Sequence, residues 1–386
     1  MPCIADPFAR QTGICRGTMI RVQRMLFLLV SAVLLLGTAS SALGRIQPDA
    51  PPPIYYLTST ILPPDQLQYQ AQALDINTRV IARLGRPLPL DNRLFDQVAW
   101  SPDRQWVALS GESSGLYLAG IARGQVEPIM IQGLVDSPMA WSPDGVRLAY
   151  VALAEDDLIQ FEGQLALWVY DRADGSRRQL ARDPAQYARL DWSPDGTRLA
   201  YVSFDGTTQT INLIEWLPDS KQTVLVTDAN DPAWSPDGAW IAYYALQGAD
   251  QEIFVIRPDG TEGRPLTRNH LQDVLPTWSP DGRWLSYLSV RGSDLDIVAL
   301  PTACLTDPAA CTPHILTAND QIDSPFMWSP DGRYLLYRTF PPGLPPQWLL
   351  LDTTCLDTAA GCDEAASHPL PLPSDESALA LVWGAG

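Results

Sequence analysis

The chain has 386 residues and a formal net charge of −18, with 26 Lys and Arg against 44 Asp and Glu. This acidity argues against nucleic acid as a partner, because phosphate binding needs a basic surface. The 35 prolines are spread along the chain and argue against long helices, because proline lacks the amide donor of the helical ladder.

Residues 1–44 form a leader that is first basic and then apolar. Four arginines against one acid precede an apolar run at 25–36, and small residues follow. This order is typical of a secretory signal peptide, so we expect export, with an uncleaved membrane anchor as the alternative. A short Pro-rich linker at 45–53 follows, and without the leader the remaining charge is 22 − 43 = −21.

Three β-rich runs come next, at 54–58, 70–76 and 80–84. They have the alternating and apolar character of short antiparallel strands. No repeat motif precedes them, so we expect them to be three strands of a unit whose first strand comes from elsewhere.

The string Trp-Ser-Pro-Asp then recurs six times, with starts 41 to 51 residues apart. This period is typical of propeller blades. After each copy come two further β-rich runs and a turn, so each repeat is predicted to form four short antiparallel strands. The copies begin at Trp100, Trp141, Trp192, Trp234, Trp278 and Trp328.

The motif has a physical rationale. Proline presets φ in a tight turn, Asp bonds the local backbone, and a following Gly adopts the positive φ needed to enter the next strand. Gly follows in five copies, whereas the first has Arg104. The Trp is a large apolar wedge that we expect between neighbouring sheets.

The end of the chain looks like the first strand of one more repeat. An apolar run at 378–382 leads into Trp383, and three residues follow. We therefore predict that this strand joins the three N-terminal runs in a composite blade over 54–386. The fold is then an all-β, seven-bladed propeller with a closed ring and no open edge, with six blades as the alternative.

Four cysteines form two matched pairs, Cys304 with Cys311 and Cys355 with Cys362, each after an apolar run and each with six residues between them. This pattern predicts two local disulfides in an oxidising compartment. A four-thiolate metal site is the alternative, although its pairs are usually two to four residues apart.

The repeat, with Leu-Ala-Tyr following it at 148–150 and 199–201, resembles the TolB-type, WD-repeat-like propeller repeat of bacterial envelope proteins. It is also similar to the propellers of prolyl oligopeptidase-type enzymes. The resemblance covers 54–386 and implies an envelope-associated binding or scaffolding role only loosely, because fold does not determine function. TolB proteins carry an α/β domain before a six-bladed propeller, and the peptidases carry a hydrolase domain; we expect neither here.

The Gly-x-Ser-x-Gly string and the three histidines are weak evidence for catalysis. Gly-x-Ser-x-Gly occurs around Ser113, but the following run is a strand rather than the helix of a nucleophile elbow, so we expect a plain turn. His270, His314 and His368 are scattered over different repeats, and we assign them no chemistry. We predict no catalytic residue and no resident cofactor.

An acidic column is the most interesting candidate site. Five aspartates stand three to five residues before a repeat Trp and are expected at one mouth of the central channel: Asp96, Asp136, Asp231, Asp273 and Asp323. Such a ring could hold Ca²⁺ or attract a basic peptide. The alternative is that each Asp caps its own turn.

The predicted function is an exported, non-catalytic and monomeric propeller that binds a protein, peptide or glycan in the periplasm, at the outer face of the envelope or outside the cell. The loops at 154–164 and 339–346 are candidates for recognition. One alternative is a polysaccharide lyase or glycosidase that uses carboxylates at the channel mouth. A sensor or structural domain that depends on a partner domain is another.

Overall fold

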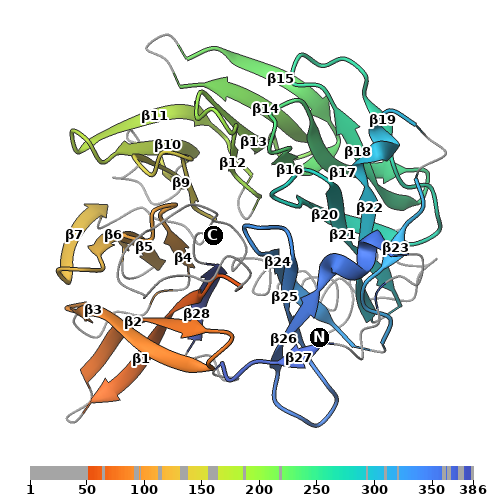
Figure 1. The fold of residues 1–386 in the computed structure, drawn as a ribbon. Coiled ribbons are helices and arrows are strands. Elements are labelled where there is room, and N and C mark those ends of the chain that lie inside the picture. Colours follow the sequence, from red (N-terminus) through yellow and green to blue (C-terminus); the bar gives the residue numbers. More distant parts are fainter. Residues whose placement is uncertain are drawn as a thin grey trace, which may run out of the picture.

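The computed structural model describes residues 51–383 apart from the segments 63–65, 91–94, 96, 112–114, 131–137, 155–163, 186–187, 217–219, 293, 308–310, 320, 359–361, 363–366 and 373–377. The predicted leader and most of the linker lie outside these residues. The described part of the chain forms seven four-stranded sheets, arranged as blades in a ring (Figure 1). No helix in that part is long and apolar enough to cross a membrane.

Six blades are built from consecutive strands, and the first strand of each is the innermost. Blades 2 and 3 contain β4 (Gln97–Trp100), β5 (Trp106–Gly111), β6 (Gly115–Gly120), β7 (Gln125–Met130), β8 (Ala140–Trp141), β9 (Arg147–Leu153), β10 (Leu165–Asp171) and β11 (Ser176–Arg182). Blades 4 and 5 contain β12 (Asp191–Trp192), β13 (Arg198–Phe204), β14 (Gln209–Glu215), β15 (Gln222–Thr227), β16 (Ala229–Trp234), β17 (Ile241–Gln247), β18 (Asp250–Ile256) and β19 (Arg264–Pro265). Blades 6 and 7 contain β20 (Gln272–Trp278), β21 (Trp284–Arg291), β22 (Asp294–Pro301), β23 (His314–Ile315), β24 (Asp323–Trp328), β25 (Tyr334–Thr339), β26 (Gln347–Asp352) and β27 (His368–Pro369).

Blade 1 is the composite blade that the sequence predicts. Its strands are β1 (Ile54–Leu62), β2 (Gln66–Asp75), β3 (Val80–Leu88) and, innermost, β28 (Ala378–Trp383). In Figure 1 the C-terminal β28 lies beside the orange β1, and Ile54 is opposite Trp383 in the antiparallel register. The prediction of seven blades closed by the C-terminal strand is therefore confirmed, and the six-blade alternative is wrong.

The repeat Trp side chains form the wedges between blades. All seven, including Trp383, are at most 6% exposed. The indole of Trp141 also donates to the Ala99 carbonyl of the preceding blade, over 3.0 Å. Equivalent bonds join Trp192 to Ala140, Trp278 to Ala233 and Trp383 to Met327, while Trp328 donates to the Ser286 hydroxyl. Each Trp thus links two blades by apolar packing, and most of them also do so by a hydrogen bond.

The Ser and Asp of the motif hold its turn in all six copies. The serine hydroxyl donates to the carboxylate two residues later, at Ser101, Ser142, Ser193, Ser235, Ser279 and Ser329. The same hydroxyl accepts the amide five residues on, which begins the second strand, as in Ser142 to Arg147. Gly145 has φ +69°, the positive value for which glycine is favoured.

Arg104 stands at the position of the turn glycine in the first copy of the motif, and its side chain forms hydrogen bonds that a glycine could not form. It also adopts positive φ, +59°, and its side chain is only 2% exposed. Its Nε donates to the Trp383 carbonyl over 2.8 Å, and its Nη1 donates to the Ser101 carbonyl over 3.1 Å. Burial lowers the pKa of this guanidinium to about 9. The one departure from the motif therefore fastens the C-terminal strand to blade 2.

The core lies between the blades rather than within one central layer. Buried apolar side chains of the described residues form seven clusters, and each combines residues of two neighbouring blades. The cluster between blades 7 and 1, for example, contains Ile54, Trp348 and Trp383. Closing the ring by β28 therefore completes two of these interfaces, because Val382 belongs to the cluster between blades 1 and 2.

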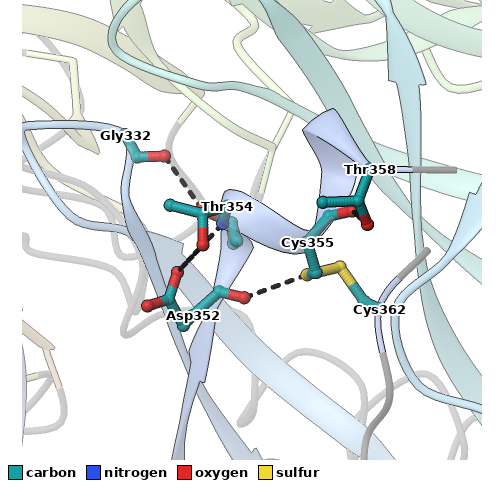
Figure 2. The surroundings of a disulfide bond; sticks show 7 residues. Gly332, Asp352, Thr354, Cys355, Thr358 and Cys362 are labelled. Carbon is teal, nitrogen blue, oxygen red and sulfur yellow. Dashed lines mark hydrogen bonds between the residues drawn. A yellow bond between two sulfur atoms is a disulfide. The ribbon is translucent and has the colours of Figure 1, made fainter. Parts of the chain in front are cut away.

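Both predicted disulfides are present, Cys304–Cys311 and Cys355–Cys362, so the four-thiolate metal site is wrong. Each closes the connection between the third and fourth strands of a blade, around a single 3₁₀ turn, η2 (Thr302–Leu305) or η4 (Thr353–Asp357). Asp352 caps η4 by accepting from the Thr354 amide and hydroxyl (Figure 2).

Candidate functional site

The ring has two faces, which differ in their connections. On what we call the turn face lie the Trp-Ser-Pro-Asp turns and the disulfide-closed connections. On the loop face, the second and third strands of each blade are joined and the innermost strand begins. The predicted recognition loop at 339–346 lies on the loop face, whereas 155–163 of the other predicted loop lie outside the described residues.

Three of the five aspartates of the acidic column lie within the described residues. Asp96 and Asp136 lie outside the described residues. Asp231, Asp273 and Asp323 stand in the innermost strands of blades 5, 6 and 7 and are at most 8% exposed. Among the described residues, no three His, Cys, Asp or Glu side chains gather in a group that could hold a metal ion. The Ca²⁺ ring at the channel mouth stays a prediction.

Two of these aspartates take local hydrogen bonds. Asn269 Nδ2 donates to Asp273 over 2.7 Å, and Asn319 Nδ2 donates to Asp323 over 2.8 Å, each from four residues earlier. Such local bonding is what turn capping requires. Asp231 differs from both, because its carboxylate accepts from the backbone amide of Arg189 in the preceding blade over 3.3 Å.

Arg189 extends across the innermost strands of three blades. It stands just before β12 of blade 4, and its Nη1 donates to the Pro276 carbonyl of β20 in blade 6 over 2.8 Å. Between them lies Asp231 of β16, held at positive φ (+47°) in a bulge. Asp191 of β12 accepts from the Trp234 amide over 2.7 Å. We call Arg189, Asp191 and Asp231 the axial cluster.

The electrostatics of the axial cluster are unusual. Burial raises the pKa of Asp191 to about 6, against the opposing effect of the Arg189 charge. Burial likewise raises the pKa of Asp231 to about 6, again opposed by Arg189. Two carboxyls with raised pKa values beside one guanidinium are the kind of arrangement that occurs at functional sites and also in structural ion networks.

Of the three residues of the axial cluster, the sequence predicts only Asp231 as a site residue and not Arg189 or Asp191. A signal was present, because the residue before the repeat Trp is Ala, Thr, Met or Val in the six other innermost strands and Asp only at Asp191. The hydrogen bond from Arg189 to Pro276 joins residues 87 positions apart and has no signal in the local sequence.

The remaining candidate residues of the sequence lie in separate parts of the ring. Gly111 and Gly115 are opposite each other where β5 turns into β6, so the Gly-x-Ser-x-Gly segment joins two strands of one blade; Ser113 itself lies outside the described residues. His270 is fully exposed between blades 5 and 6. His314 and His368 lie in the outermost strands of blades 6 and 7.

The raised pKa of Asp231 predicts a pH dependence of stability. An unfolded Asp titrates near pH ~3.9, so between about pH 4 and pH 6 the folded state binds the proton more strongly. This carboxyl therefore makes folding less favourable as the pH rises through that window. We expect the unfolding free energy of Asp231→Asn, relative to wild type, to increase by up to about 2 kcal/mol from pH 4 to pH 7 in urea titrations.

Asp195→Asn is the control with the opposite sign. A hydrogen bond from Ser193 lowers the pKa of Asp195, so its stabilising effect is lost as the pH falls. A difference between wild type and Asp231→Asn that stays constant from pH 4 to pH 7 would contradict the burial of the Asp231 carboxyl.

Comparisons with known proteins agree with this fold. The family model of the TolB β-propeller domain matches residues 147–338. The β-propeller domain of the trilobed protease from Pyrococcus furiosus is 11% identical with a TM-score of 0.57, covering 84% of this chain and 93% of that one. An oligogalacturonate lyase in complex with manganese is 13% identical with a TM-score of 0.55, covering 82% and 98%. TolB from Acinetobacter baumannii is 15% identical with a TM-score of 0.49, covering 94% and 93%.

At these identities the protease domain and the lyase, with TM-scores above 0.5, are evidence of the fold alone. The Pyrococcus domain has an open velcro topology, whereas β28 closes the ring here. The match to the TolB family rests on the repeats of blades 3 to 7. Residues 147–338 belong to the TolB β-propeller domain family, and because the same motif and four-stranded blades continue on both sides of them, the chain is a TolB-type β-propeller repeat protein.

Proposed function

We propose that the protein is an exported, non-catalytic propeller that binds a protein, peptide or glycan partner through its loop face. The observation that carries the proposal is the axial cluster, because Arg189, Asp191 and Asp231 are charged groups that the repeat framework does not require. Several of the blade-to-blade links elsewhere are made by the indoles of the repeat Trp residues and by main-chain carbonyls.

Exposed apolar side chains on the loop face also support this proposal. Phe204, Leu246 and Leu344 stand at or beside second-to-third strand connections and are 44%, 64% and 60% exposed. Exposed apolar side chains near polar groups are typical of recognition surfaces. Loops on a rigid scaffold commonly carry binding, and a closed ring is such a scaffold.

Export is supported by the leader predicted at 1–44 and by the two disulfides. Disulfides persist in oxidising, extracytoplasmic compartments and are rare in the reducing cytosol. We propose a periplasmic, surface or secreted location and a monomeric state.

Affinity capture from envelope extract tests the proposal. Immobilised wild type is expected to retain a partner that Arg189→Ala and Asp191→Asn retain at least tenfold less well. Val224→Ala in the outer strand β15, where the side chain is 61% exposed, is the matched surface control. Retention that is equal for all four proteins would contradict binding at the loop face.

A polysaccharide lyase or glycosidase is the second candidate, because Asp191 and Asp231 have pKa values near 6, the range that suits acid–base catalysis. A reducing-end and ultraviolet assay over a polysaccharide panel distinguishes the two functions. Turnover that is lost in Asp191→Asn would favour the enzyme and overturn the non-catalytic assignment.

A further inference from the structure

Two buried carboxylates between blades 5 and 6 accept hydrogen bonds from the same asparagine. Glu252 of β18 is 2% exposed and Asp273 of β20 is fully buried. The Asn269 backbone amide donates to Glu252 Oε1 over 2.7 Å, and its side-chain Nδ2 donates to Asp273 Oδ2 over 2.7 Å. The two acids therefore lie on either side of a single residue.

The pair also shares a buried tyrosine. Burial, and after it the charges of Asp273 and Glu252, raise the pKa of Tyr287. Tyr287 stands on β21, two residues before Ser289, whose hydroxyl donates to Asp273 Oδ1 over 2.7 Å.

One oxygen of this group has no hydrogen-bond partner. Glu252 Oε2 is buried and accepts nothing from the part of the chain that the structure describes. A buried carboxylate oxygen without a partner is unfavourable by several kcal/mol, so proteins normally supply a donor or a cation.

The neighbouring interface repeats this arrangement of two acids and one asparagine, with an arginine beside it. Between blades 6 and 7, Asp296 occupies the position of Glu252, and Asn319 donates to Asp323 as Asn269 does to Asp273. There, Arg291 Nη2 lies 3.7 Å from the Asp296 carboxylate.

The strand registers identify the residue that replaces this arginine. Arg291 is paired with Asp294 at the tip of the β21–β22 hairpin, and Gln247 is paired with Asp250 at the tip of the β17–β18 hairpin. Blade 5 thus has a neutral Gln247 where blade 6 has Arg291. No described Lys or Arg forms an ion pair with Glu252 or Asp273.

We propose that Glu252 and Asp273 bind a calcium ion between blades 5 and 6, which supplies the positive charge that Arg291 supplies between blades 6 and 7. Ca²⁺ prefers hard oxygen ligands and accepts irregular coordination. Two carboxylates provide the charge, the Ser289 and Thr267 hydroxyls that hydrogen-bond to Asp273 provide neutral oxygens, and water completes the shell. This site is independent of the axial cluster and of partner binding.

The consequence is a calcium-dependent stabilisation of one blade interface. Extracellular calcium modules commonly have dissociation constants of about 10⁻⁴–10⁻³ M. The ion links β18 of blade 5 to β20 of blade 6 and binds the folded ring alone, so saturating Ca²⁺ raises the unfolding temperature.

Calorimetric and thermal titration of the chelator-treated full chain with Ca²⁺ is the test. Wild type is expected to bind one ion and to show a saturable rise of several degrees in its thermal midpoint. Glu252→Gln is expected to weaken binding at least tenfold. Asp296→Asn, at the interface that Arg291 neutralises, is the matched control and is expected to keep the full calcium response.

Gln247→Arg is the second, decisive variant, because it copies the arginine of blade 6 into blade 5. It is expected to raise the midpoint in the presence of chelator and to abolish the further rise with Ca²⁺. No calcium-dependent heat or shift in wild type, or a shift that both Glu252→Gln and Gln247→Arg retain, would overturn the proposal.

Discussion

Deleting residues 378–386 is expected to destabilise the ring more than any single substitution in it. The deletion removes β28, the innermost strand of blade 1, and exposes the edge of β1. It also removes Val382 and Trp383, which are buried in two different blade interfaces. Loss of the Trp alone is worth about 3–5 kcal/mol, so the thermal midpoint should fall by about 5 °C or more.

Two variants separate closure from general truncation. Deleting only residues 384–386 leaves β28 in place and is expected to change the midpoint by less than about 1 °C. Arg104→Met removes the hydrogen bond to the Trp383 carbonyl from a buried side chain and is expected to destabilise by about 2 kcal/mol. An unchanged midpoint on deletion of residues 378–386, measured by circular dichroism, would show that β28 does not close the ring.

Trp141→Ala is expected to have the next largest effect, a loss of about 3–5 kcal/mol in unfolding free energy. Trp141 is 3% exposed and packs with Leu116 of blade 2 and Leu148 of blade 3. Its removal leaves a cavity between two rigid sheets that cannot easily move together.

Trp141→Phe tests the hydrogen bond separately from the wedge. The phenyl ring fills most of the volume but leaves the Ala99 carbonyl without its donor, so we expect a smaller loss of about 1–2 kcal/mol. Urea titrations of both variants measure these losses. Trp216→Ala, at a partly exposed tryptophan outside the motif, is the control; an equally large loss there would contradict a special role of the repeat Trp.

The repeat explains why so much of the fold can be predicted. Trp-Ser-Pro-Asp-Gly specifies a turn through local chemistry, so six copies place six innermost strands without any knowledge of distant contacts. The disulfides follow the same logic, because both pairs are local and equally spaced. Even ring closure is visible in the sequence, since Trp383 ends a strand that otherwise lacks partners.

The features that escape prediction depend on contacts between distant segments. Arg104 is recognisable as a departure from the motif, but its bond to Trp383 spans 279 residues. Arg189 and Asp191 are brought to Asp231 and Pro276 only by the order of blades around the ring. The acidic column likewise could be predicted by position, whereas the asparagine donors to Asp273 and Asp323 depend on how each inter-blade loop folds.

Site-specific photocrosslinking in intact envelopes tests partner binding at the loop face most directly. A benzoylphenylalanine replaces Phe204 or Leu246 on the loop face, or Val224 on the outer strand β15, all exposed apolar positions. We predict one discrete covalent adduct from Phe204 and Leu246 and none from Val224. Adducts from Val224 alone, or none from any of the three positions, would contradict a partner-binding loop face.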